Sequence, residues 1–120
     1  MTPEGQVIAA CLEILAIRRL PHGRINVGGF KVEKRFIRTA RPGTADLWCN
    51  IGPCGRCIWI EAKAAKGKQS PEQARFQQEV EAVGAVYLLV RSGEELERAL
   101  KLLAEAPGLT SEHLRGAMRC

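Results

Sequence analysis

The chain has 120 residues, 46% of them hydrophobic and 26% charged, which is enough for one domain with a single buried core. No apolar run is long enough to cross a membrane, and the first residues carry no signal-peptide pattern, so we expect no membrane partner. The five cysteines are irregularly spaced, which favours reduced thiols in the cytoplasm and excludes a disulfide-stapled secreted scaffold.

Positive charge is concentrated in one part of the sequence. The net charge is +5, but residues 18–41 contain eight basic residues and one acidic residue, a charge of +7 that leaves −2 elsewhere. The basic residues are Arg18, Arg19, Arg24, Lys31, Lys34, Arg35, Arg38 and Arg41. Such concentration is typical of a protein that binds a polyanion such as nucleic acid, although a solvated basic surface gives the same pattern.

The first residues predict a helix over residues 3–20. Thr2 is a suitable N-cap, Pro3 suits the first helical position, and Glu4 favours the positive end of the helix dipole. The apolar stripe of this helix consists of Ile8, Cys11, Leu12 and Leu15. Glu4 lies four residues before Ile8, at the end of the stripe, where it either stabilises the dipole or faces a buried site.

After a turn at residues 21–23, residues 24–38 predict one strand that bends at Gly28 and Gly29. Lys34 and Arg38 belong to the basic segment, and we expect them to contact nucleic acid. Residues 39–42 follow as a basic loop, in which Arg41 is well placed to meet a phosphate.

Residues 43–63 predict a β-hairpin, because two apolar runs flank a glycine- and proline-containing loop at residues 52–56. Strand side chains alternate, so Glu61 and Lys63 lie on one face. The opposite face is filled by Ile58, Ile60 and Ala62. A carboxylate and an amine at the end of a hydrophobic strand are costly to desolvate, which favours a site where a cation and an anion lie between them.

The register of the hairpin decides whether two carboxylates meet. If Asn50 pairs with Cys57, Asp46 lies opposite Glu61 with the Cβ atoms roughly 5 Å apart, whereas a slip of one residue separates the two carboxylates. We predict the first register. Two carboxylates at that spacing suit Mg²⁺, and Lys63 is then placed to position a water or to offset charge on a phosphate.

The hairpin also contains a C-x₄-C-x₂-C pattern formed by Cys49, Cys54 and Cys57. A structural zinc ion would need a fourth ligand from a distant part of the chain. We therefore favour reduced thiols, with Cys49 facing the core, and rank a zinc-binding interaction domain last among the alternatives.

A basic loop and a helix follow the hairpin. We expect Lys66 and Lys68 in the loop to touch the backbone of a nucleic acid. Ser70 and Gln73 then predict a capping box at the start of a helix that ends at Gly84. The inward stripe of this helix consists of Gln73, Phe76, Val80 and Val83. Gln73 therefore faces the sheet, where we expect it to orient Lys63 or a phosphate.

The remaining residues predict a buried strand over residues 86–90 and a helix opened by a second capping box, Ser92 with Glu95. Its inward residues are Leu96, Ala99, Leu100 and Leu103. Residues 107–108 end this helix, and a short helix is expected around Leu114. The element order is α-β-β-β-α-β-α, an α/β fold with a mixed central sheet and helices on both faces. We predict a single domain over residues 1–120, with a core over residues 2–105 and a C-terminal extension.

The pattern Gly43-x-x-Asp46 followed by Glu61-x-Lys63 resembles the signature of the PD-(D/E)xK nucleases. Residues 70–76 and 2–5 narrow the resemblance to the VRR-NUC branch, over about residues 2–92. The resemblance implies a restriction-endonuclease-like fold and a Mg²⁺- or Mn²⁺-dependent deoxyribonuclease. The chain differs from the family in two features. Thr44-Ala45 replaces a proline often found before the aspartate, and the hairpin loop contains a cysteine pair that the family does not require.

The resemblance also implies residue roles. Asp46, Glu61 and the main-chain carbonyl of Ala62 would bind the metal, Lys63 would assist the attacking water, and Glu4 and Gln73 would support the site. Arg24 and Asn26 resemble an Arg-x-Asn pair that contacts nucleic acid. Small members of the family act as dimers and some cut four-way (Holliday) junctions, so a homodimeric, phage-encoded endonuclease for branched DNA is expected. The alternative is a non-catalytic nucleic-acid-binding module built on the same basic segment.

Overall fold

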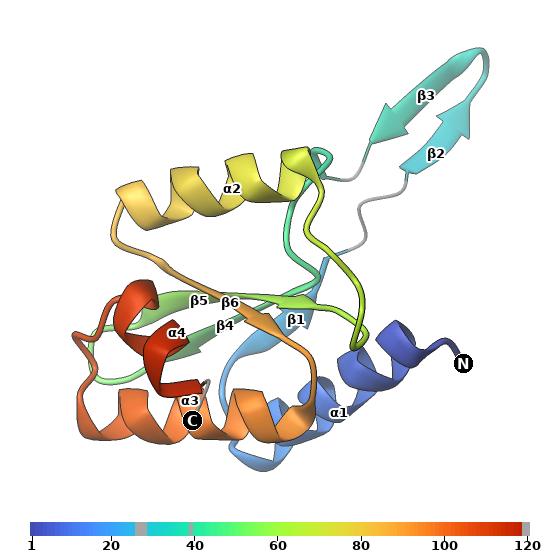
Figure 1. The fold of residues 1–120 in the computed structure, drawn as a ribbon. Coiled ribbons are helices and arrows are strands. Elements are labelled where there is room, and N and C mark those ends of the chain that lie inside the picture. The colour runs from blue at the N-terminus through green and yellow to red at the C-terminus, as the bar shows by residue number, and fades with distance from the viewer. Residues whose placement is uncertain (26–28, 39, 119–120) are drawn as a thin grey trace.

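The computed structural model describes residues 1–25, 29–38 and 40–118 (Figure 1). The helices within these ranges are α1 (Pro3–Ile17), α2 (Pro71–Ala82), α3 (Gly93–Glu105) and α4 (Ser111–Met118). The strands are β1 (His22–Arg24), β2 (Gly29–Val32), β3 (Arg35–Arg38), β4 (Leu47–Ile51), β5 (Arg56–Ala62) and β6 (Val86–Val90). The prediction of a mixed α/β protein is confirmed.

Four strands form a mixed sheet in the order β1-β4-β5-β6. The β1–β4 and β4–β5 pairs are antiparallel, whereas β5 and β6 are parallel. Asn50 pairs with Cys57, so the predicted register of the central hairpin is confirmed. The last pair at the other end is Leu47 with Ile60, which leaves Asp46 one residue beyond the ladder and next to Glu61.

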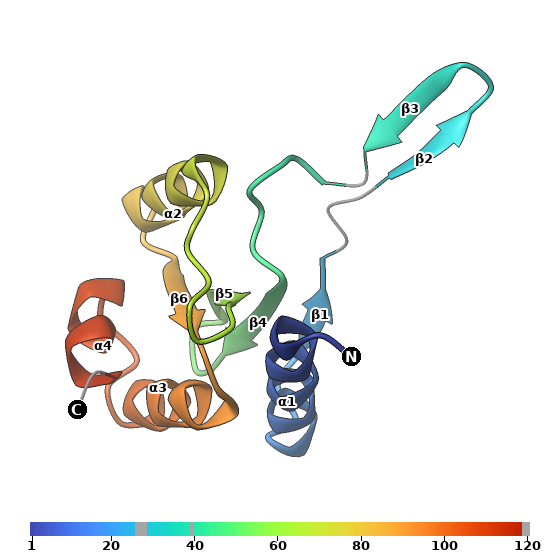
Figure 2. The ribbon, with the colours of Figure 1, turned by 45° about the vertical axis from the view of Figure 1, so that its right-hand side comes forward.

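Helices cover both faces of this sheet (Figures 1 and 2). On one face α1 and α3 bury the larger part of the core, to which Cys11, Leu47, Ile60 and Leu100 contribute. On the other face α2 packs through Phe76, which meets the edge of Trp59 at 5.1 Å between ring centroids. The alternation of strand side chains therefore divides each strand between two layers of helices.

Three serine or threonine N-caps begin the helices as predicted. Thr2 accepts from the N–H of Gly5, and Ser92 accepts from the N–H of Glu95. Ser70 and Gln73 form the complete reciprocal capping box. Of the described helices, none is both long and apolar enough to span a membrane.

The predicted continuous strand over residues 24–38 is wrong. Strand β1 ends at Arg24, and β2 and β3 form a separate antiparallel ribbon that projects from the body of the molecule (Figures 1 and 2). The chain reverses between Val32 and Arg35, where Glu33 adopts a positive φ of 57°. A two-residue turn with the first residue at positive φ suits a hairpin, but glutamate gives no signal for it in the sequence.

Two smaller predictions also need correction. Helix α1 ends at Ile17 instead of Leu20, because Arg19 turns to a φ of 57° and leaves the helical conformation. Val83 does not belong to the inward stripe of α2, since it follows the last helical residue and is 83% exposed.

Gly43 allows the segment before Asp46 to pass the first turn of α2. Its φ is +91°, and a Cβ atom here would lie 2.4 Å from the carbonyl oxygen of Glu72. Gly84 has a similar φ of +88°, but a Cβ atom there would meet nothing within 4 Å. The two glycines therefore share a conformational requirement and differ in the space around them.

We predict that Gly84→Ala lowers the free energy of unfolding by about 1 kcal/mol, the cost of a left-handed conformation. Gly43→Ala should lower it by about 2 kcal/mol more, because the backbone of α2 must also move. Urea denaturation of both variants measures the difference. Equal losses would show that the close approach to Glu72 has no energetic consequence.

Candidate metal centre

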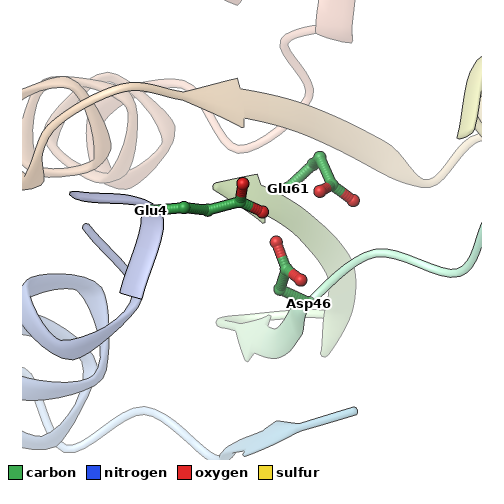
Figure 3. A group of neighbouring side chains, drawn as sticks. All are labelled: Glu4, Asp46 and Glu61. Atoms are coloured by element: carbon green, nitrogen blue, oxygen red, sulfur yellow. The ribbon is translucent and has the colours of Figure 1, made fainter. Parts of the chain in front are cut away.

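Three carboxylates from distant parts of the chain come together at one end of the sheet (Figure 3). Glu4 lies in the first turn of α1, Asp46 directly before β4, and Glu61 near the end of β5. One oxygen from each residue lies within 4.8 Å of the other two. Among the described residues, no other group of three potential metal ligands converges in this way.

Asp46 is fixed by bonds to two neighbouring segments. Its Oδ2 atom accepts from the N–H of Ala62 at 2.8 Å, which ties the side chain to β5. Its main-chain carbonyl accepts from the N–H of Ile25 at 2.7 Å, which ties it to the segment after β1. The second Asp46 oxygen is thereby directed to the side where Glu4 and Glu61 lie (Figure 3).

Glu61 is almost completely buried, with 1% of its surface exposed. Its Oε2 atom accepts from the side-chain amide of Gln73 at 3.2 Å and lies 3.8 Å from Lys63 Nζ. Its Oε1 atom is buried and accepts no hydrogen bond from the described N–H and O–H groups. A buried carboxylate oxygen without a donor is costly unless a proton or a cation occupies the adjacent space.

Burial raises the pKa of Glu61 from 4.5 to about 8, and the charge of Asp46 and a hydrogen bond to it act in the same direction. Lys63 opposes this shift, and Glu4 adds to it weakly. With no metal bound, the raised pKa favours the protonated form of Glu61 at neutral pH.

The cluster could hold a metal ion, and its chemistry fits a hard divalent cation. Carboxylate oxygens are the ligands that Mg²⁺ and similar ions prefer. One oxygen from each of Glu4, Asp46 and Glu61 would hold the cation, since these atoms already lie within 4.8 Å of one another. The buried Oε1 of Glu61 gains a partner from such a cation.

Lys63 is the cation that accompanies these acids. Only 8% of its surface is exposed, and its N–H donates to the carbonyl of Val90 at 2.9 Å, which continues the parallel pairing of β5 with β6. Its alkyl chain runs beneath Gly67, where a Cβ atom would lie 3.4 Å from Lys63 Cδ. The ammonium group is therefore held on the face of Glu61, as the alternation of strand residues predicts.

Gln73 faces the site, but its partner differs from the predicted one. The amide oxygen accepts from the N–H of Ser70 at 2.8 Å, and the amide nitrogen donates to Glu61 at 3.2 Å. Gln73 therefore links the start of α2 to Glu61, where the sequence analysis expected Lys63 or a phosphate. The same side chain completes the capping box and orients a carboxylate of the cluster.

Arg91 is a residue near the site that the sequence analysis missed. It follows β6 directly, and its Nη1 atom donates to the carbonyls of Ala64 at 2.6 Å and Gly67 at 2.8 Å. These bonds fix the loop that begins after Lys63. Arg91 could have been found from its place in the sequence, directly after the strand over residues 86–90. The carboxyl ends of parallel neighbouring strands meet at the same edge of a sheet, so Arg91 lies near the end of β5.

The predicted nucleic-acid contacts lie in several parts of the structure, and one of them lies beside the acidic cluster. Arg24 lines a surface hollow together with Glu4, Asp46 and Ala64. Lys66 and Lys68 are exposed in the loop held by Arg91, and Lys34 is exposed at the turn of the projecting ribbon. Asn26 and the side chain of Arg38 lie outside the described part of the structure.

Arg41 has partners within the protein. Its guanidinium forms an ion pair with Glu79 and lies 5.5 Å from the centre of the Phe76 ring. More than half of its side chain is exposed. Arg41 thus attaches the segment before Asp46 to α2 and still presents charge to solvent.

The cysteines do not form a second metal centre within the described ranges. Cys49 lies in the core, as predicted, where burial raises the pKa of its thiol to about 12. Cys54 is exposed in the hairpin loop, and Cys57 points to the opposite face of the sheet from Cys49. The zinc-binding alternative finds no support in this arrangement.

Comparison with models of known protein families and with curated proteins finds no match to this chain. The chemistry of the site is therefore inferred from its own geometry.

The stability of the metal-free protein should fall as the pH rises from about 4.5 to about 8. Over this range the folded state keeps a proton on Glu61 that the unfolded state has lost, so deprotonation favours unfolding. Glu61→Gln, which resembles the protonated acid, should flatten this dependence. Urea denaturation in EDTA at several pH values tests it, with Glu112→Gln on the exposed side of α4 as control. Parallel curves for wild type and Glu61→Gln would contradict the raised pKa.

We further predict that Mg²⁺ or Mn²⁺ raises the melting temperature, and more strongly at pH 8 than at pH 6, because the cation must displace the proton of the pair. Asp46→Asn should abolish this response, whereas Glu112→Gln should keep it. Thermal unfolding with and without EDTA provides the measurement. A response to the metal that survives in Asp46→Asn would place the binding site elsewhere.

Proposed function

We propose that this chain is a Mg²⁺- or Mn²⁺-dependent nuclease that hydrolyses phosphodiester bonds in DNA. The observation that carries the proposal is the convergence of Glu4, Asp46 and Glu61 beside Lys63, whose Nζ lies 3.8 Å from Glu61. Carboxylates that hold a divalent cation, with a lysine beside them, are suited to metal-assisted hydrolysis of a phosphate ester.

We extend the proposal to a restriction-endonuclease-like core of the VRR-NUC branch, on the basis of the sequence resemblance. In this proposal the β4–β5 hairpin carries Asp46, Glu61 and Lys63, α1 supplies Glu4 from one face of the sheet, and α2 supplies Gln73 from the other. The mixed sheet with helices on both faces is consistent with that class. The sequence resemblance gives the class its name.

Each residue then has a defined role. Asp46, Glu61 and the Ala62 carbonyl hold the cation, and Glu4 completes its surroundings directly or through water. The cation, when bound, offsets the negative charge of the phosphate and makes a bound water more acidic. Lys63 orients the attacking water or offsets charge that develops on the phosphate. Gln73 keeps Glu61 in place through its amide.

A non-catalytic nucleic-acid-binding module is the alternative. Such a module gains nothing from three carboxylates facing a phosphate, because they repel the ligand. The cost of burying Glu61 next to Asp46 is explained if a cation is recruited there. We therefore favour the nuclease.

The substrate and assembly extend this proposal. One domain of 120 residues offers little surface to a branched duplex, and small members of the resembled family act as dimers. We therefore propose a homodimer that acts in the cytoplasm on branched DNA such as four-way junctions.

The proposal is tested by cleavage of labelled linear duplex, single strand, flap and four-way junction with Mg²⁺, with Mn²⁺ and with EDTA. We expect metal-dependent cutting, fastest on the junction, and a loss of about 100-fold or more in Lys63→Ala. Lys101→Ala, on the exposed side of α3, is the matched control and should cut at the wild-type rate.

Two results would overturn the assignment. Salt-sensitive binding without cleavage in either metal would favour the binding module. Cleavage that persists in both Lys63→Ala and EDTA would mean that the activity comes from another site or from a contaminant.

A further inference from the structure

The β2–β3 ribbon stands apart from the rest of the fold. It extends beyond the sheet and the helices in both views (Figures 1 and 2). The molecule is accordingly elongated, with extents of 50, 31 and 28 Å. Its radius of gyration is 14.6 Å, compared with about 13.6 Å for a compact domain of this length.

The ribbon presents basic and apolar side chains together. Residues 31–37 are all exposed, and they include Lys31, Lys34 and Arg35 against the single acid Glu33. The apolar members are Val32, Phe36 and Ile37, which are 41%, 60% and 37% exposed. Large apolar side chains at the surface are typical of an interaction site, and the positive charge indicates an anionic partner.

The pairing of the ribbon distributes these side chains over two faces. Val32 lies opposite Arg35, and Lys31 lies opposite Phe36. Residues directly opposite in an antiparallel pair share a face, so each face combines a basic and an apolar side chain. Neither face is a plain hydrophobic surface of the kind that packs into a protein core.

We propose that this ribbon lies in the major groove of double-stranded DNA, with its basic side chains on the flanking phosphates and its apolar side chains on base edges. The major groove is about 12 Å wide and admits a two-stranded ribbon. The proposal deepens the proposed nuclease function and rests on it, since it names an element that binds the duplex substrate. An isolated two-stranded ribbon is only marginally stable, and contact with a groove on both faces stabilises it.

The charge of the ribbon disfavours a second copy of the chain as its occupant. Residues 29–38 contain four basic residues and one acid, so each ribbon has a net charge of +3 and two ribbons side by side repel. The phosphates of a duplex have the opposite charge. In this proposal the DNA-binding ribbon is separate from the acidic cluster, where a phosphate binds only together with a cation.

The test is binding of a labelled duplex and of the corresponding single strand, measured by fluorescence anisotropy in EDTA between about 50 and 200 mM salt. Lys31→Ala/Lys34→Ala should weaken duplex binding severalfold and lower the slope of log affinity against log salt by about 1.8. Single-strand binding should change little. Lys101→Glu alters the total charge by the same amount on α3 and should leave the slope unchanged.

Two further arms keep the proposal testable if the double variant is unstable. Glu33→Gln removes the single acid of the described ribbon and should tighten duplex binding severalfold. A duplex with bulky substituents at pyrimidine C5, which project into the major groove, should bind the wild type more weakly than an unmodified duplex.

Each outcome has one meaning. Unchanged duplex affinity in both ribbon variants, Lys31→Ala/Lys34→Ala and Glu33→Gln, would overturn the ribbon proposal. It would also be overturned if light scattering showed that these variants change from dimer to monomer while their affinity for DNA stays the same. Because binding is measured without metal, absence of cleavage in the nuclease assay would overturn the proposed function and leave the ribbon result standing on its own.

Discussion

The structure depends on the burial of Glu61 next to Asp46. Burial raises the pKa of Glu61 to about 8, and the nearby charge of Asp46 acts in the same direction. The surrounding groups limit this cost: Asp46 accepts the N–H of Ala62, and Lys63 and Gln73 face Glu61. What remains is a buried oxygen that needs either a proton or a cation. The site is thus unstable when fully ionised and empty, a condition that favours metal binding.

The cluster is assembled from elements whose ends are fixed by local devices. The Thr2 cap sets the first turn of α1 and so the position of Glu4, and Gly43 lets the segment before Asp46 approach α2. Gln73 couples the start of α2 to Glu61 because each end of its amide group has a different partner. Arg91 fixes the loop beyond Lys63 from the neighbouring parallel strand. Catalytic geometry in the proposed nuclease would therefore respond to changes at the helix starts as well as at the acids.

Charge is separated within the fold. Negative side chains meet at the end of the central sheet, whereas the exposed residues 31–37 of the ribbon contain three basic residues and one acid. Under the proposed function, the ribbon provides affinity, and the acids provide the position for the cation.

The sequence by itself determined the features that depend on short-range patterns. Caps at Thr2, Ser70 and Ser92 were predictable because a side-chain oxygen bonds to an N–H three residues away. The register that joins Asp46 to Glu61 was predicted because, of the two registers considered, it is the one that brings the two carboxylates together. The turn at Glu33 carried no residue signal and was decided by the three-dimensional structure. The same is true of the partner of Gln73 and of the loop contacts of Arg91. These depend on how α2 and β6 pack beside β5, and packing of segments distant in sequence leaves no periodic trace in the chain.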